Sequence, residues 1–210
     1  RSTLFPYTTL FRSLELDRVP AVRRVIVGIT GASGTVYGIR LLQALHAMEG
    51  IETHLVVSPC GHLTRSLETD VSKEELEALA DVVHSPDDMA AAISSGSFRT
   101  SGMVVAPCSM RSLAEIANGV TSSLVTRAAD VVLKERRRLV LVARETPLSL
   151  IHVRNMAAVI EAGAIVLPPV PSFYTRPRTV GDIVDQTVGR CLDLMGLEMA
   201  GLPRWGGAAP

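Results

Sequence analysis

The chain alternates between short apolar runs and longer stretches with apolar residues at helical spacing. Near-continuous apolar runs predict buried strands at 23–30, 52–58, 102–107, 138–144 and 163–169. Helical spacing predicts helices at 35–48, 109–118, 121–136, 149–161 and 179–195. Because strands and helices alternate, we expect an α/β fold: a single doubly wound domain, Rossmann- or flavodoxin-like, with a mostly parallel sheet flanked by helices.

The expected domain covers residues 23–198, and residues 199–210 form a C-terminal tail. The first residues, "RSTLFPYTTLFRS", have neither the continuous apolar core nor the small-residue cleavage site of a signal peptide. We therefore interpret residues 1–22 as an unstructured or artefactual arm.

Charge and cysteine usage exclude several function classes. The 21 basic and 21 acidic residues balance, so nothing indicates a nucleic acid or an anionic membrane as a partner. The apolar runs are too short to span a bilayer, which takes about 20 residues. The three cysteines lie far apart and form no Cys-x-x-Cys motif, which favours a reducing cytoplasm and no structural zinc.

Polar residues follow the expected strands, at the edge of the sheet where ligands bind in doubly wound folds. The segments concerned are "GASG" (31–34), "SPCGH" (58–62), "PCSMRS" (107–112), "RETPLS" (144–149) and "PPVPSFYTRP" (168–177). A ligand site is expected where these segments meet.

The "GASG" turn has two possible interpretations. It could seat an anion on the amides of a helix start, or it could be a tight turn with Ser33 as helix N-cap. It lacks the G-x-G-x-x-G spacing and a P-loop lysine, so a mononucleotide fits better than a dinucleotide. Ser58-Pro59 is typical of an N-cap followed by Pro at the first helical position. Cys108 is expected to be buried and inert.

Several charged and phenolic side chains could serve a phosphate-bearing substrate if they converge. Arg127 and Lys134 are seven residues apart and share one side of a helix, where a solvated basic face is the alternative interpretation. The remaining members of this set are Arg144, Glu145, Tyr174 and Arg190.

The chain resembles the flavin prenyltransferases of the UbiX type over residues 23–205. The matching motifs are "VGITGASG-x-x-YG-x-RLL" (27–42), "SLETD" (66–70), "PCS" (107–109), "TRAADVVLKERRRLVLVARETPLS" (126–149), "LPPVPSFYTRP" (167–177) and "GLPRW" (201–205). The long motif around 126–149 is specific, whereas "GASG" alone is weak.

The resemblance implies a fold that holds FMN in a large homo-oligomer, a dodecamer. It implies transfer of a dimethylallyl group from dimethylallyl phosphate to N5 and C6 of reduced FMN, without a metal. The product, prenylated FMN, serves UbiD-type decarboxylases, including the one in ubiquinone synthesis.

The resemblance also assigns roles by position. Catalytic roles would fall to Glu145, Glu68, Lys134 and Arg127. FMN would be bound by Gly31, Ala32, Ser33, Ser58, Ser109, Met110, Arg111, Ser112 and Arg144. The donor phosphate would be held by Tyr174 and Arg190, and Trp205 would cover the site from a neighbouring subunit. One departure is Pro59, where relatives carry a basic residue.

Two alternatives remain at this point. An FMN-dependent decarboxylase of cysteine-derived carboxylates shares this architecture, but it carries a "PASANT"-like segment where this chain has "PCSMRS", and an early catalytic histidine. His46 and His62 do not stand in that context. A non-catalytic flavin carrier would need "GASG" and Arg144, but not Tyr174, Arg190, Lys134 and Glu145 together.

Overall fold

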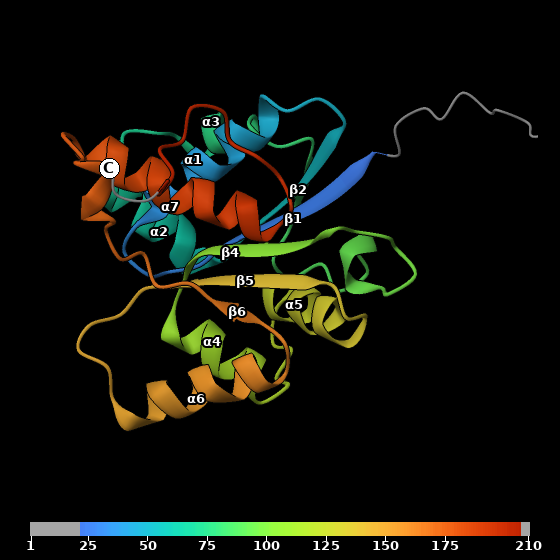
Figure 1. The fold of residues 1–210 in the computed structure, drawn as a ribbon. Coiled ribbons are helices and arrows are strands. Elements are labelled where there is room, and N and C mark those ends of the chain that lie inside the picture. Colours follow the sequence, from blue (N-terminus) through green and yellow to red (C-terminus); the bar gives the residue numbers. More distant parts are fainter. Residues whose placement is uncertain (1–21, 207–210) are drawn as a thin grey trace, which may run out of the picture.

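A computed structural model describes residues 22–206. Six parallel strands form a sheet at the centre of the fold (Figure 1). The strands are β1 (Arg23–Ile29), β2 (Ile51–Val57), β3 (Val82–His84), β4 (Gly102–Cys108), β5 (Arg138–Ala143) and β6 (Ile165–Val166). Their order in the sheet is β3-β2-β1-β4-β5-β6. The chain therefore runs outward from β1 to one edge, then returns beside β1 and runs to the other edge, which confirms the doubly wound α/β prediction.

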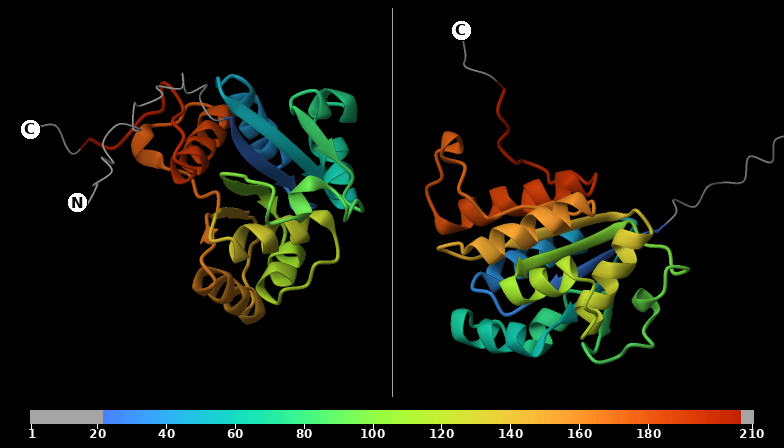
Figure 2. Two further views of the ribbon diagram at one scale, coloured as in Figure 1. Left: turned by 90° about the vertical axis from the view of Figure 1, so that its right-hand side faces the viewer. Right: turned by 90° about the horizontal axis from the view of Figure 1, so that it is seen from below.

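Helices cover both faces of this sheet (Figure 2). They are α1 (Thr35–His46), α2 (Pro59–Glu68), α3 (Lys73–Glu77), α4 (Met110–Ala117), α5 (Leu124–Lys134), α6 (Leu150–Glu161) and α7 (Val180–Leu194). Side chains of α1 and α7 pack on one face of the strands, and those of α4, α5 and α6 pack on the other. None of these helices is long and apolar enough to cross a membrane.

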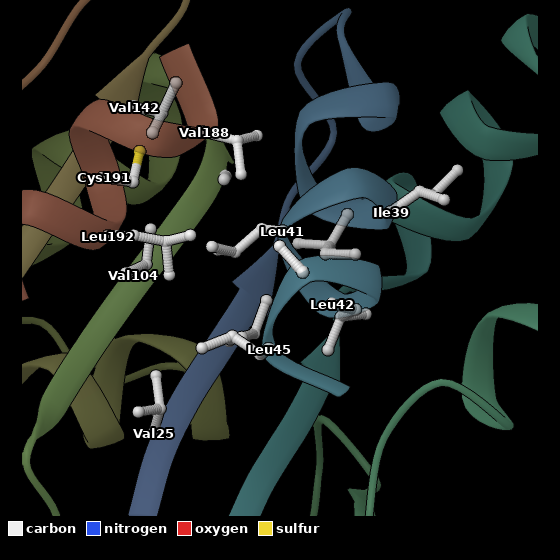
Figure 3. Close-up of a cluster of buried hydrophobic side chains, with 14 of the residues drawn as sticks. Val25, Ile39, Leu41, Leu42, Leu45, Val104, Val142, Val188, Cys191 and Leu192 are labelled. Atoms are coloured by element: carbon white, nitrogen blue, oxygen red, sulfur yellow. The ribbon is translucent and has the colours of Figure 1, made fainter. Parts of the chain in front are cut away.

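The core explains why the strand sequences are almost continuously apolar. Leu41 and Leu45 of α1 and Leu192 of α7 meet Val104 of β4 in a cluster from which water is excluded (Figure 3). The opposite residues of the same strands pack on α4 and α5, so successive side chains of a central strand are buried on both faces.

The predicted strands and helices are confirmed in kind, with differences at their ends. Only residues 165–166 of the predicted strand 163–169 pair with a neighbour, and the predicted helix 121–136 begins at Leu124 and ends at Lys134. The pattern did not predict the helical extent of α2, or α3 and β3, because these are short or only partly buried. The start of α2 was predicted correctly: Ser58 caps it and Pro59 opens it.

Candidate functional site

The tips of β1 and β4 are tied together at the point where the strand order reverses. Buried Thr30 donates its hydroxyl to the carbonyl of Pro107 at 2.8 Å and accepts the amide of Ser109 at 2.8 Å. In doubly wound sheets this switch point opens a crevice at the carboxyl ends of the strands. These hydrogen bonds hold the two strand tips together at the base of the crevice, which we call the floor of the site.

Gly31 lies against α2 at this floor. A Cβ atom on Gly31 would stand 2.4 Å from the Cβ of Cys60, so any side chain there would force the loop and α2 apart. The first turn of α2 thus packs directly on the loop after β1, which brings Ser58 and Cys60 beside it.

A pocket of about 380 Å³ opens between the tips of β1, β2 and β4. We call it the tip pocket. Five of the predicted flavin-binding residues line it: Gly31, Ser58, Ser109, Arg111 and Ser112. Pro59 and Cys60 of the predicted tip segment 58–62 also line it, and sequence reasoning missed the other lining residues, namely Pro86, Asp87, Glu115, Ser122 and Ser123. Most of the second group come from segments that are distant in sequence, so no local motif could have indicated them.

Ser58 and Ser109 of the tip pocket cap the starts of α2 and α4. Ser58 accepts the amide of Gly61 at 3.0 Å, and Ser109 accepts the amide of Ser112 at 3.3 Å. These bonds confirm the capping interpretation. Ser58 keeps its hydroxyl hydrogen for a polar ligand, whereas Ser109 donates its hydrogen to the Ser112 hydroxyl at 3.2 Å and leaves the Ser112 hydrogen for a ligand.

The remaining predicted flavin ligands stand around the tip pocket rather than in its lining. Ala32 is buried, and Arg144 is exposed at the end of β5, where its amide donates to the carbonyl of Cys108 at 3.2 Å. Met110 is half-buried in the first turn of α4 and packs against the core.

Glu68 occupies the position that the sequence suggested for a ligand anion. Its Oε2 accepts the amides of Gly34 and Thr35, at 2.8 and 3.1 Å, at the start of α1. The N-cap of α1 is Gly34, with φ of 106°, so the alternative of a Ser33 N-cap is wrong. A carboxylate of the chain itself therefore accepts two of the amides at this helix start, and the amides of Gly34 and Thr35 are not free for a ligand phosphate.

The electrostatics of Glu68 follow from these bonds. Burial raises the pKa of this carboxyl, but hydrogen bonds from the Ser33 side chain and the two amides outweigh burial, so the pKa lies below its usual range. The Arg144 guanidinium lowers the pKa further. Ser33, Glu68 and Arg144 thus form one charged unit beside the tip pocket, with Glu68 ionised at neutral pH.

A second pocket, of about 300 Å³, contains both predicted donor-binding residues. We call it the Tyr174 pocket. Tyr174 follows the tip of β6, Arg190 projects from α7, and Trp205 lies edge-on to the Tyr174 ring, with ring centroids 5.6 Å apart. Trp205 was expected to act from a neighbouring subunit, but here it contacts Tyr174 of its own chain.

Asp193 pairs with both arginines of the Tyr174 pocket. Its carboxylate accepts from Arg190 at 2.8 Å and from both terminal nitrogens of Arg204 at 2.8 and 2.9 Å. The Arg204 hydrogen bonds are the largest cause that lowers the pKa of Asp193, against a smaller opposing effect of burial. Sequence reasoning missed Asp193 and Arg204, whose pairing depends on the return of residues 199–206 across α7.

Arg127 and Lys134 do not reach either pocket within one chain. Arg127 donates to the carbonyl of Ser94 at 3.2 Å and pairs with Asp130 at 2.7 Å. Lys134 ends α5 beside the start of β5 and pairs with Glu135 (Figure 1). Among the described residues, neither cation contacts Tyr174 or Arg190.

Glu145 stands exposed in the loop after β5. Its Oε1 accepts the amide of Thr146 at 3.0 Å, so the carboxylate is at a sheet tip, as predicted, with one oxygen free of described partners. The prediction that Cys108 is buried is confirmed, and burial raises the pKa of its thiol to about 12, which disfavours the reactive thiolate.

Comparisons with known proteins agree with this geometry. The flavoprotein family model matches residues 15–192. The chain is 54% identical over 189 residues to the flavin prenyltransferase UbiX of Escherichia coli K12, covering 89% of this chain and all of that protein. The chain belongs to the UbiX family of flavin prenyltransferases.

Two solved structures of UbiX proteins share the fold closely. The crystal structure of AnUbiX (PadA1) in complex with FMN and dimethylallyl pyrophosphate has a TM-score of 0.87 and 53% identity, covering 89% of this chain and 99% of that one. A structure described as a dodecameric FMN-dependent UbiX-like decarboxylase from Escherichia coli O157:H7 has a TM-score of 0.86 and 55% identity, covering 88% of this chain and all of that one. These likenesses confirm the family that the motifs indicated.

Proposed function

We propose that this chain transfers a dimethylallyl group from dimethylallyl phosphate to N5 and C6 of reduced FMN, and that UbiD-type decarboxylases receive the prenylated FMN. The observation that carries the proposal is the 54% identity over the whole of a flavin prenyltransferase. The two pockets support it, because one suits a flavin and the other suits an anion.

The tip pocket fits FMN in its donor set. Hydroxyls of Ser58, Ser109 and Ser112 line it together with the Arg111 guanidinium, and α2 and α4 both begin at its wall. Hydroxyls, helix-start amides and a cation are the groups that bind phosphate and polar flavin edges. Arg144 adds positive charge at the neighbouring tip.

Bound reduced FMN supplies the nucleophilic atoms, so the protein needs no nucleophile of its own. In our proposal Tyr174 and Arg190 hold the phosphate of the donor and stabilise its charge as the allylic carbon–oxygen bond breaks. Glu145 gives a proton to the departing phosphate or accepts the one lost from C6. Glu68, through Ser33, keeps the β1 loop in place beside the flavin.

A homo-oligomer, proposed as a dodecamer, would bring the remaining cations to the site. Arg127 and Lys134 lie away from the Tyr174 pocket of their own chain, so a neighbouring copy would have to supply them. The apolar side chains exposed on α6, Leu150 and Ile151, are consistent with such contacts, with 64% and 68% of their surfaces exposed.

Anaerobic incubation with dithionite-reduced FMN and dimethylallyl phosphate, followed by mass spectrometry of the extracted flavin, tests the reaction. We expect a flavin heavier by one C5H8 unit. Unchanged FMN on folded protein, with the phosphate and the pyrophosphate donor alike, would refute the transferase. The Glu145→Gln variant then separates enzyme from carrier: it should bind FMN normally and lose turnover, whereas a carrier would be unaffected.

Co-assembly of two inactive variants tests whether cations come from a second copy. Lys134→Ala and Tyr174→Phe chains, expressed together, should regain up to about a quarter of wild-type activity if each site combines residues of two copies. If each site lies within one chain, the mixture should remain as inactive as its components.

A further inference from the structure

Gln186 is a buried polar residue that the family assignment leaves without a role. It lies on α7, one helical turn before Arg190, and only 6% of its surface is exposed. Its side chain lines the Tyr174 pocket. The amide nitrogen Nε2 donates to the Tyr174 hydroxyl at 3.3 Å.

The other end of this amide is unsatisfied. Oε1 of Gln186 is buried and has no hydrogen-bond partner among residues 22–206. Burying a carbonyl without a donor destabilises a folded protein relative to an apolar side chain of the same shape. Stability alone therefore does not explain a glutamine at this position. The unsatisfied amide indicates a functional role in the pocket that Gln186 lines.

The single bond that Gln186 makes determines how Tyr174 can act. A phenol oxygen has one hydrogen and accepts through its lone pairs. Since the Gln186 amide donates to this oxygen, the phenol hydrogen is left for another acceptor. Trp205, edge-on to the ring at an interplanar angle of 80°, limits the positions that the ring can take.

The acceptor that completes this arrangement is an anionic oxygen. Arg190 lines the same pocket one turn along α7, and Asp193 engages only its Nη1, so an anion held by the other terminal nitrogen would share this pocket with the Tyr174 hydroxyl. Hydrogen bonds from neutral donors to ionised oxygens are short and strong, and they depend on the donor's direction. A phosphate bound there would gain most from a phenol that is already oriented.

We propose that Gln186 is a positioning residue for the prenyl donor: its amide orients the Tyr174 hydroxyl so that the phenol hydrogen is donated to the donor's phosphate. This inference rests on the proposed function. It predicts that Gln186 acts only through Tyr174 and has no part in flavin binding, since no residue of the Tyr174 pocket lines the tip pocket.

The Gln186→Met variant tests the proposal, because methionine keeps the length and loses the amide. The titrant is dimethylallyl phosphate added to FMN-loaded protein, with heat measured by calorimetry. We expect donor Kd to rise about 3- to 10-fold while FMN affinity stays the same, as for the loss of one neutral hydrogen bond, because the phenol remains and only its orientation by the amide is lost. The Tm should equal or exceed that of the wild type, because an unpaired buried carbonyl is removed.

Three companion variants make the outcome decisive. In a Tyr174→Phe background, Gln186→Met should change donor Kd by less than about twofold, since the partner is already absent. Gln186→Glu should weaken donor binding more than methionine does, because a carboxylate accepts the phenol hydrogen and repels the phosphate. Thr187→Val removes a neighbouring buried hydroxyl that bonds the carbonyl of Ile183, so it should lower Tm slightly and leave donor Kd unchanged.

Each result bears on a separate claim. If the wild type neither binds nor consumes the donor, the proposed function fails and this inference fails with it. If the wild type binds the donor and Gln186→Met binds it equally well, the positioning role alone is refuted. A lowered Tm with a proportional loss of flavin and donor binding, or full activity in Gln186→Glu, would likewise overturn it.

Discussion

Replacing Glu68 tests how the start of α1 is held beside the proposed flavin site. In the Glu68→Ala variant, two amides at the start of α1 lose the carboxylate that accepts them at 2.8 and 3.1 Å. Losing a helix N-terminal cap costs about 0.5–2 kcal/mol, and the interaction of an anion with the helix dipole adds about 0.3–1 kcal/mol. Because Glu68 is largely exposed, we expect a total of about 1–2 kcal/mol.

Thermal unfolding followed by circular dichroism measures this loss. For a domain of this size, 1 kcal/mol corresponds to about 2–4 °C, so Tm at pH 7 should fall by roughly 3–6 °C in Glu68→Ala. Glu68→Gln keeps an acceptor oxygen and loses only the charge, so its Tm should fall by about 1–3 °C. The control is Glu161→Ala, an exposed glutamate at the end of α6 with no side-chain hydrogen bond to the described residues.

The pH dependence gives the sharper test. The pKa of Glu68 is lower in the folded chain than in the unfolded chain, so its ionised form stabilises the fold at pH values above the unfolded pKa of about 4.3. That contribution is lost as pH falls through the folded pKa. The difference in Tm between wild type and Glu68→Gln should therefore be constant at neutral pH and shrink progressively as pH is lowered through the folded pKa. A difference that stays constant with pH, or no effect of Glu68→Ala at pH 7, would refute the cap.

Two further predictions concern packing and thiol reactivity. A Cβ on Gly189 would lie 2.2 Å from Cδ2 of Leu202, so Gly189→Ala should displace residues 199–206 from α7. Donor Kd should then rise several-fold, while FMN affinity in a fluorescence titration should stay unchanged. Cys60 is exposed in the tip pocket, whereas burial raises the pKa of Cys108 and Cys191 to about 12. Native protein should thus show one fast-reacting thiol per chain with a disulfide reagent, and saturating FMN should slow the reaction of that thiol. Three fast-reacting thiols, or no protection by FMN, would contradict the placement of Cys60 in the flavin site.

The central fold was predictable because its strands are buried on both faces. Runs such as 102–107 are apolar throughout, and only a strand covered on both sides requires that pattern. The edge strand β3, three residues long and only partly buried, leaves no comparable signal. Short capped segments such as α3 are stabilised by a capping box, where Ser72 and Glu75 satisfy each other's amides, rather than by an apolar face.

The site residues likewise include some that the sequence could predict and others that it could not. Tyr174, Arg190 and Trp205 could be grouped in advance only through the resemblance to a family, since 30 residues lie between the first and the last. The partner of the "GASG" turn was not foreseeable from the turn itself. Glu68 reaches it from the far end of α2, and that contact exists only because Gly31 lets the first turn of α2 pack so closely.

The separation of the two pockets has a consequence for how specificity could change. The tip pocket is built on the ends of β1, β2 and β4, and the Tyr174 pocket on α7 and the returning residues 199–206, with no lining residue in common. Substitutions in the second set are therefore expected to leave cofactor affinity unchanged. Because this pocket would hold the phosphate of the donor, exchanging the last few residues of the described chain should change the preference for the anionic group of the donor while the flavin-binding residues stay intact.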